Sequence, residues 1–195
     1  MYKILIIIVT LFCSCSDKIS SDQQDFEKII FNVNANLISD PIALDDSFTM
    51  SFPNIVFKNN DAFNTLNNHL KNDNNSYFPF RLIDLFSNDN ILIYIGQIEQ
   101  ANLFSKLNSN YIEALKETYN VESINMGKFN INGVNVVQYM FNDEKSFTIK
   151  LYMNILDKFY EITYILNASI YEDSLKYIES SIGSVKSIQK GGRNK

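Results

Sequence analysis

The residues of this sequence that could do chemistry at neutral pH are few. His69 is the only histidine, and its neighbours Asn67 and Asn68 carry uncharged amides. A zinc site needs further nitrogen or sulfur ligands, and both cysteines, Cys13 and Cys15, lie near the first residue. We therefore expect no catalytic residue, no metal and no cofactor, and we place His69 on the solvated side of a helix.

Carboxylates at suggestive spacings are a second set of candidates. Glu113 and Glu117 are four residues apart, so a helix would place them on one face, where like charges repel. Asp84 and Asp89 lie near asparagines, but the alternating acidic calcium loop with its central glycine and final glutamate is absent. The chain also lacks a Gly-x-Ser-x-Gly elbow, a phosphate loop and a dinucleotide fingerprint. These features favour solvated carboxylates and a protein that is not an enzyme.

The two cysteines end an unusual leader, MYKILIIIVTLFCSC. Lys3 precedes an apolar run that ends at Phe12, and Ser14 directly precedes Cys15. A charged start, an apolar middle and a small residue before the cut are typical of an export signal. A helix over this run would be about 18 Å long. This length is too short for a hydrocarbon core of about 30 Å, so the leader is not a membrane-spanning helix.

The end of the leader, Phe12-Cys13-Ser14-Cys15, resembles the lipobox of bacterial lipoproteins. The resemblance implies that residues 1–14 are a signal peptide and that Cys15 becomes the acylated first residue, followed by a polar tether over 15–24. Several acyl chains on one cysteine hold a protein firmly on a membrane. Ser16 stands where aspartate would retain a lipoprotein in the inner membrane, which favours the outer membrane. The alternative is ordinary secretion with a released or buried cysteine pair.

The composition narrows the class of protein further. The chain has 195 residues, with 17 Lys+Arg against 22 Asp+Glu and a net charge of −5. Nucleic-acid binding is not expected, because it needs clustered cations. The folded part has no cysteine pair for a disulfide. An apolar share of 46% suits one compact domain, which we expect over 25–190 with a frayed tail at 191–195.

Hydrophobic periodicity predicts helices and strands in the first two thirds. Residues 22–37 fit both a helical stripe and strand alternation, and we favour a helix over their first half. A strand at 47–52 precedes a helix at 61–71. The run at 91–98 is apolar on both faces, as in an interior strand. A helical stretch at 100–119 follows, of which the second half is the stronger.

The later part predicts an antiparallel meander. Asn132-Gly133 is a strong hairpin signal, because a type I′ turn needs positive φ at both positions. Three strands are expected to follow at 134–141, 147–155 and 159–166. A last helix follows them, for which Ser169 and Glu172 match a capping box, and its apolar face is Tyr171, Leu175, Ile178 and Ile182.

Pairing apolar residues gives the expected register. A two-residue turn at Asp157-Lys158 places Ile155 opposite Tyr160, and closing the 142–146 loop places Phe141 opposite Phe147. Several side chains then fall on the sheet face opposite the main apolar face: Phe129, Ile131, Val134, Val136 and Tyr152. We take Phe129, Ile131, Val136 and Tyr152 as a candidate binding face. The alternative is that helix 109–119 covers them.

The run after Phe159, YEITYILNASIYEDSLKYIESSIGSVKSI, is similar to the closing strand and helix of the PsbP-like and DcrB-like families. Ser184-Val185-Lys186 stands in the place of their Ser-x-Lys-like terminus. The resemblance covers about residues 120–189. It implies an antiparallel sheet with helices packed on both sides, in domains that are mostly non-enzymatic accessory modules or lipoproteins.

These observations favour an α+β domain with a mainly antiparallel sheet, helices on both faces and the last helix on the meander. The expected function is that of a lipid-anchored envelope module that binds a protein partner without catalysis. Two alternatives stay open: a carrier or sensor of a small apolar ligand, and an envelope hydrolase using acidic residues and His69. A cavity of several hundred cubic ångströms lined by Phe and Tyr would favour the carrier. Carboxylates gathered around His69 in a cleft would favour the hydrolase.

Overall fold

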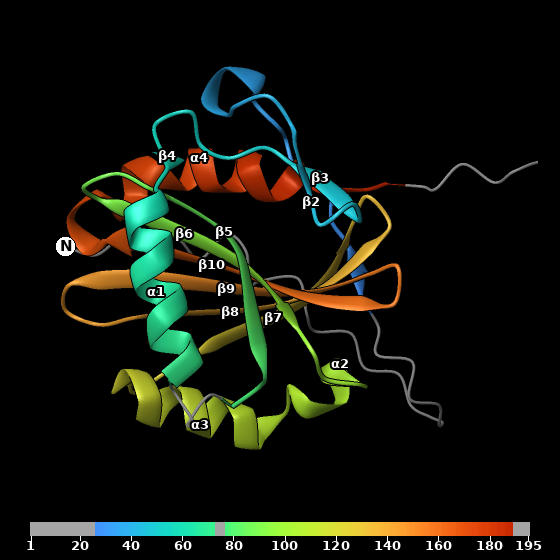
Figure 1. The fold of residues 1–195 in the computed structure, drawn as a ribbon, viewed down its shortest axis with the longest axis vertical. Coiled ribbons are helices and arrows are strands. Elements are labelled where there is room, and N and C mark those ends of the chain that lie inside the picture. The colour runs from blue at the N-terminus through green and yellow to red at the C-terminus, as the bar shows by residue number, and fades with distance from the viewer. Residues whose placement is uncertain (1–25, 73–76, 189–195) are drawn as a thin grey trace, which may run out of the picture.

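An eight-stranded sheet forms the centre of the protein (Figure 1). The computed structural model describes residues 26–72 and 77–188. The strand order is β1-β7-β8-β9-β10-β6-β5-β4, and every pairing is antiparallel except that of β1 with β7. The strands are β1 (Glu27–Lys28), β4 (Phe57–Lys58), β5 (Phe80–Ser87), β6 (Ile91–Ile98), β7 (Asn125–Ile131), β8 (Val134–Asn142), β9 (Ser146–Ile155) and β10 (Lys158–Asn167).

Helices cover both faces of this sheet, so the predicted α+β class is confirmed. Figure 1 shows α4 on one side of the sheet and α3 on the other, with α1 crossing in front. A three-stranded sheet, in the order β11-β3-β2, lies beside α4. The remaining elements are η1 (Ala35–Leu37), β2 (Ile42–Leu44), β3 (Phe48–Met50), α1 (Asn60–Asn72), α2 (Leu103–Lys106), α3 (Ser109–Tyr119), η2 (Ala168–Ile170), α4 (Tyr171–Gly183) and β11 (Lys186–Ser187).

The two faces of the sheet belong to two separate hydrophobic clusters. The larger cluster lies under α4 and the small sheet, and includes Leu151, Ile162 and Ile178. The second lies under α2 and α3, and includes Leu103, Tyr111 and Tyr152. Both faces of β6 and β9 are therefore buried, which explains the nearly continuous apolar runs in these strands.

The turns of the meander follow the predicted chemistry in part. Asn132 and Gly133 have φ values of 50° and 85°, as a type I′ turn requires, so the β7–β8 hairpin is confirmed. The β9–β10 turn is Leu156-Asp157, with φ values of 51° and 62°, and the predicted turn at 157–158 is wrong by one position. Tyr160 therefore lies opposite Met153 rather than opposite Ile155. The pairing shifts by two residues, so each side chain keeps its face.

The β8–β9 connection changes the faces. Phe147 lies opposite Asn142, and Phe141 lies opposite Thr148, which is one residue away from the predicted register. Oδ1 of Asp143 accepts the amides of Lys145 and Ser146 at 2.7 and 2.6 Å and so fixes the tight turn. A one-residue slip exchanges the two faces of a strand, so every residue of β8 points to the side opposite the predicted one.

The predicted binding face is wrong as a single surface for this reason. Phe129, Ile131 and Val136 lie in the main core with α4, and Tyr152 lies on the other side, in the cluster with α3. All four side chains are buried. The alternative, cover by helix 109–119, holds for Tyr152, whose ring packs against Tyr111 of α3 at 5.8 Å between centroids.

Two local predictions are also wrong. The described part of 22–37 has no α-helix: β1 pairs in parallel with β7, and a single 3₁₀ turn follows at Ala35–Leu37. The last helix has no capping box at Ser169. Instead, Asn167 accepts the amide of Ser169 and begins the η2 turn that leads into α4. The signal, the Cys15 lipidation site, the tether and the tail lie outside the described residues.

Candidate functional site: an aromatic pocket with a charged floor

A pocket of about 330 Å³ lies between α1, α3 and the face of the sheet opposite α4. This volume is within the range of small-ligand sites. Most of the lining is apolar or aromatic, and three charged residues join it. The described residues that line it are Leu66, Leu70, Tyr77, Phe78, Phe80, Tyr94, Tyr111, Ala114, Leu115, Glu117, Thr118, Tyr119, Lys150, Tyr152 and Glu161.

Edge-to-face ring contacts hold the aromatic wall together. Tyr77 lies 4.8 Å from Phe78 and 4.9 Å from Tyr111 between ring centroids. Tyr111 also packs against Tyr139 and Tyr152 at 5.5 and 5.8 Å. Such pairs add about 0.5–1.5 kcal/mol each beyond their buried area. The wall is therefore assembled before any ligand arrives, with Tyr77 half exposed.

Gly96 in β6 makes room for one ring of the pocket. Phe80 of β5 lies directly over this glycine, where a Cβ would overlap the far end of the ring. Phe80 also meets Tyr94 edge to face at 6.0 Å. A glycine in a strand interior often marks such a close approach. The Phe80 ring can therefore take its position in the pocket only because residue 96 is a glycine, which has no side chain.

An ion pair forms the floor of the pocket. Nζ of Lys150 lies 2.6 Å from Oε1 of Glu161, and the two side chains are 6% and 9% exposed. Nζ also donates to Oγ1 of Thr163 at 3.2 Å and to the hydroxyl of Tyr94 at 3.3 Å. Taking two charges out of water costs several kcal/mol per ion before their attraction is counted. Stability alone is therefore a poor reason for this pair.

A chain of hydroxyls extends from Glu161 toward α3. Thr163 donates to Oε1 of Glu161 at 2.8 Å, and Tyr152 stands directly opposite Glu161 in the β9–β10 ladder. The hydroxyls of Tyr111 and Tyr152 form a short hydrogen bond. Tyr152 thus lies between the ion pair of β9 and β10 and helix α3, and every buried polar side-chain atom of the described residues has a partner.

The protonation states of these groups follow from their burial. Burial lowers the pKa of the Lys150 ammonium, but the attractions of Glu161 and of the nearby tyrosines together outweigh this and leave the pKa well above 10.5. Burial raises the pKa values of Tyr94, Tyr111 and Tyr152. At neutral pH the floor therefore holds a charged lysine and protonated phenols, which suits binding better than proton transfer.

Of the candidate residues predicted from the sequence, Tyr152 and Glu117 line this pocket, and the others lie elsewhere. His69 is exposed on α1 and Glu113 is exposed on α3, paired with Lys116 at 2.9 Å. Asp84 is buried and pairs with Lys58 at 2.8 Å. Across the described ranges no three His, Cys, Asp or Glu side chains gather as metal ligands would.

Lys150 and Glu161 are the functional candidates that sequence reasoning missed. Each stands in the middle of a strand between apolar residues on both sides, at a position that strict alternation assigns to one face. A lysine and a glutamate at such positions in neighbouring strands indicate a buried ion pair, since charged residues are rarely buried without a partner. The predicted register instead placed Asn154 opposite Glu161, where the structure places Tyr152.

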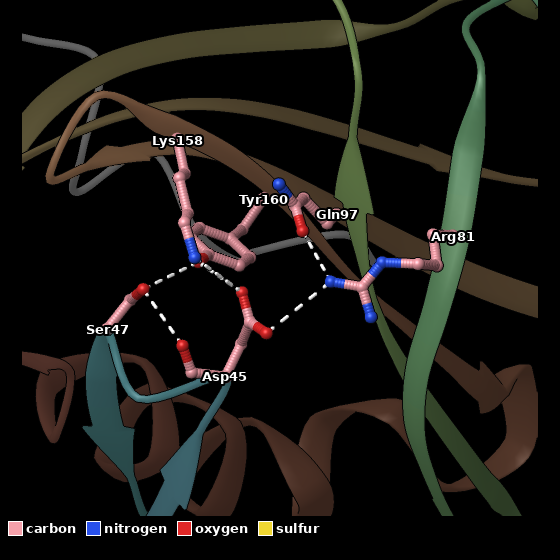
Figure 2. A network of polar contacts seen from close by, with 6 residues as sticks. All are labelled: Asp45, Ser47, Arg81, Gln97, Lys158 and Tyr160. Atoms are coloured by element: carbon pink, nitrogen blue, oxygen red, sulfur yellow. Dashed lines mark hydrogen bonds and ion pairs between the residues drawn. The ribbon is translucent and has the colours of Figure 1, made fainter.

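A second polar network fastens the small sheet to the large one (Figure 2). Asp45 begins the β2–β3 turn in a left-handed conformation, with a φ of 48°. Its carboxylate accepts from Lys158 at 3.1 Å, from the Tyr160 hydroxyl at 2.9 Å and from Arg81 at 3.4 Å. Partial burial raises the pKa of Asp45, but the hydrogen bonds from Lys158 and Tyr160 and the nearby positive charges together lower it by more. The pKa of Asp45 therefore lies below its usual 3.8. This cluster is satisfied internally, so we interpret it as a structural joint.

Comparisons with known proteins leave the function open. The sequence matches no protein-family model, and it matches no functionally curated protein. Its fold is weakly similar to the crystal structure of PA94, a protein of unknown function from Pseudomonas aeruginosa, with 9% identity and a TM-score of 0.35. The match covers 75% of this chain and 94% of that one. None of the helices in the described ranges has the length and hydropathy to cross a membrane.

Proposed function

We propose that this protein is a non-catalytic binding module that holds a small ligand in the aromatic pocket. The observation that carries the proposal is a pocket of about 330 Å³ whose walls are Phe and Tyr and whose floor is the ion pair of Lys150 and Glu161. An open aromatic cavity is what distinguishes a ligand carrier or sensor from a module with a filled core. Docking of a protein partner stays a prediction.

The polar floor supports binding rather than turnover. A hydrolase would need a nucleophile next to a base of suitable pKa. The high pKa of Lys150 leaves no free amine to act as a base at neutral pH, and His69 is not among the lining residues. A charged, fully hydrogen-bonded floor instead orients a ligand, because few precisely placed polar groups give a largely apolar pocket its specificity.

Filling the pocket tests this function. Ala114 lines the cavity on α3, while Glu113 is its exposed neighbour. The full chain, purified from the cells that make it, is examined by native mass spectrometry. We expect a bound small molecule in the unaltered protein and in Glu113→Trp, and its loss in Ala114→Trp. Retention of the compound by Ala114→Trp, or absence of any compound from the unaltered protein, would contradict the proposal.

We also propose that the module is tethered to the bacterial envelope, with the outer membrane favoured over the inner, through acyl chains on Cys15. The support is the lipobox-like Phe12-Cys13-Ser14-Cys15 and the polar stretch behind it. The similarity of residues 120–189 to PsbP-like and DcrB-like domains fits such a role, because those domains are mostly accessory modules. Mass spectrometry of the native N-terminus decides: an intact leader, or a Cys15 without fatty acid, excludes the tether.

A further inference from the structure

Lys150 carries the one positive charge among the described residues that line the pocket, and the protein already uses that charge. Its Nζ lies 2.6 Å from Oε1 of Glu161, 3.2 Å from Oγ1 of Thr163 and 3.3 Å from the Tyr94 hydroxyl. An ammonium has three protons to donate, and three acceptors of the protein surround this one. An anionic ligand therefore meets no free donor on Lys150, and it is repelled by the carboxylates of Glu161 and Glu117.

Lys150 also uses the attraction of the ring faces for a cation. Nζ lies 5.6 Å from the ring centroid of Tyr94 and 5.8 Å from that of Tyr119, within the range of cation–π contacts. An ammonium ligand at these rings would be repelled by Lys150, and Glu161 is already neutralised by the same lysine. Glu117 is exposed, where an ion pair contributes little. Burying a ligand charge of either sign here therefore costs solvation that the lining does not replace.

Perpendicular rings form the wall of the pocket. Phe80 of β5 and Tyr94 of β6 have centroids 6.0 Å apart and planes at 89°. Tyr77 and Tyr111 meet at 4.9 Å and 61°. Such pairs present the edge of one ring beside the face of another, and a further flat ring gains edge-to-face contacts of the same kind. A saturated ring of the same size lacks the positive edge and negative face on which these contacts depend.

We propose that the pocket binds a small uncharged aromatic compound, and that Phe80, which lies over Gly96, is the residue of the wall that selects an aromatic ring. This inference rests on the proposed function and names the class of its ligand. A Cβ at residue 96 would overlap the far end of the Phe80 ring, so the ring keeps this position only while residue 96 is a glycine. The volume of about 330 Å³ admits a single ring with a short chain.

The test compares four probes of nearly equal length: neutral 2-phenylethanol, 2-phenylethylammonium, 3-phenylpropanoate and the saturated 2-cyclohexylethanol. Dissociation constants are measured on the full chain at pH 7 by NMR titration observed on the ligand. We expect 2-phenylethanol to bind about tenfold more tightly than either charged probe. It should also bind about threefold more tightly than 2-cyclohexylethanol, although the saturated ring is the more apolar of the two.

Two variants test the role of the Phe80 ring. Gly96→Ala displaces the ring, and Phe80→Ala removes it. Each should abolish the preference for the aromatic over the saturated ring, and the double variant should lose no more than Phe80→Ala alone. Phe57→Ala removes an exposed ring of β4 outside this pocket and should leave all four dissociation constants unchanged. Losses that add in the double variant, or an aromatic preference that survives Phe80→Ala, would overturn the role of Phe80.

The outcomes separate this inference from the proposed function. Tightest binding of a charged probe, or equal binding of all four, overturns the uncharged aromatic class and leaves a ligand-binding pocket in place. Tightest binding of 2-cyclohexylethanol reduces the selection to apolar area and overturns the role of the rings. If no probe binds below about 10 mM, the inference fails. The native mass measurement on Ala114→Trp then decides separately whether the pocket binds anything.

Discussion

Lys150 and Glu161 meet diagonally across β9 and β10. Glu161 stands directly opposite Tyr152, and Lys150 stands directly opposite Thr163, yet Nζ reaches Oε1 at 2.6 Å. The diagonal geometry leaves the Tyr152 and Thr163 hydroxyls beside the same carboxylate. The four residues thus form one buried polar cluster. Removing any one of them leaves a buried polar group without its partner.

The first prediction concerns the balance of this unit. Glu161→Gln leaves the Lys150 ammonium buried without a counter-charge, and we expect it to lower the free energy of unfolding by about 3–5 kcal/mol. The double variant Lys150→Met with Glu161→Leu should recover most of this loss, because well-packed apolar residues often replace a buried pair without cost. Urea unfolding followed by circular dichroism measures both.

Glu113→Gln is the matched control, because it breaks the exposed pair with Lys116 and should cost at most about 0.5 kcal/mol. The double variant could instead lose as much stability as the single variants Lys150→Met and Glu161→Leu lose together. That result would show that the pair is needed for the fold itself. A role in binding would then not be needed to explain why the pair is buried.

The second prediction is a loss of stability at alkaline pH. The pKa of Lys150 and those of Tyr94, Tyr111, Tyr152 and Tyr164 are raised in the folded protein. A raised pKa contributes stability that is complete below the unfolded value, here 10.5 for lysine and 10.0 for tyrosine, and is lost as pH rises further. The melting temperature should therefore fall steeply above pH 10.

Absorbance of tyrosinate at alkaline pH checks the assignment. The buried phenols should ionise only together with unfolding, in one cooperative step. Smooth titration of all tyrosines in the folded state, without loss of circular dichroism, would contradict the buried arrangement of the pocket floor.

The third prediction concerns the joint between the two sheets. Asp45→Asn removes the charge that Lys158, Arg81 and Tyr160 share, and we expect a loss of about 1–2 kcal/mol. Because the pKa of Asp45 lies below its usual 3.8, its contribution is present above pH 3.8 and disappears as pH falls through the folded value. Asp45→Asn should therefore be less stable than the unaltered protein at pH 6. Its melting temperature should also fall less than that of the unaltered protein as the pH is lowered.

Thermal unfolding between pH 2 and pH 6 measures this difference. Asp46→Asn is the control, because Asp46 is the exposed neighbour in the same turn, with a similar φ of 52°. Equal losses in the two variants would assign the effect to turn conformation rather than to the ionic joint.

The fourth prediction concerns the last residue of α4. A Cβ at Gly183 would overlap Cβ of Phe31 and lie 2.8 Å from Cγ2 of Val33. Because this segment would have to shift, we expect Gly183→Ala to cost about 1–3 kcal/mol. Gly127→Ala, whose Cβ would lie 3.6 Å from the Phe129 ring, should be close to neutral. Chemical denaturation of both proteins gives the comparison, and equal effects would remove close packing as the reason for the glycine at 183.

Local rules in the sequence determined much of the fold. The hairpin at Asn132-Gly133 depends only on two residues that accept positive φ. The α+β class, the strand at 91–98 and the helix at 109–119 follow from the period of apolar residues, which each segment carries by itself. The helix expected within 22–37 failed because the competing strand alternation was decided by pairing with β7, a partner about a hundred positions away.

Only the tertiary structure decided which faces β7 and β8 present to the main core. The carboxylate of Asp143 accepts hydrogen bonds from the backbone amides of Lys145 and Ser146, and these bonds set the length of the β8–β9 turn. A single position there moves Val136 into the main core and Tyr139 to the α3 side. The pocket floor depends on the β9–β10 register as well, because Glu161 lies diagonally beside Lys150 only when it pairs with Tyr152 and not with Asn154. Apolar residues occur on both faces of these strands, so hydrophobic pattern alone does not distinguish one register from the next.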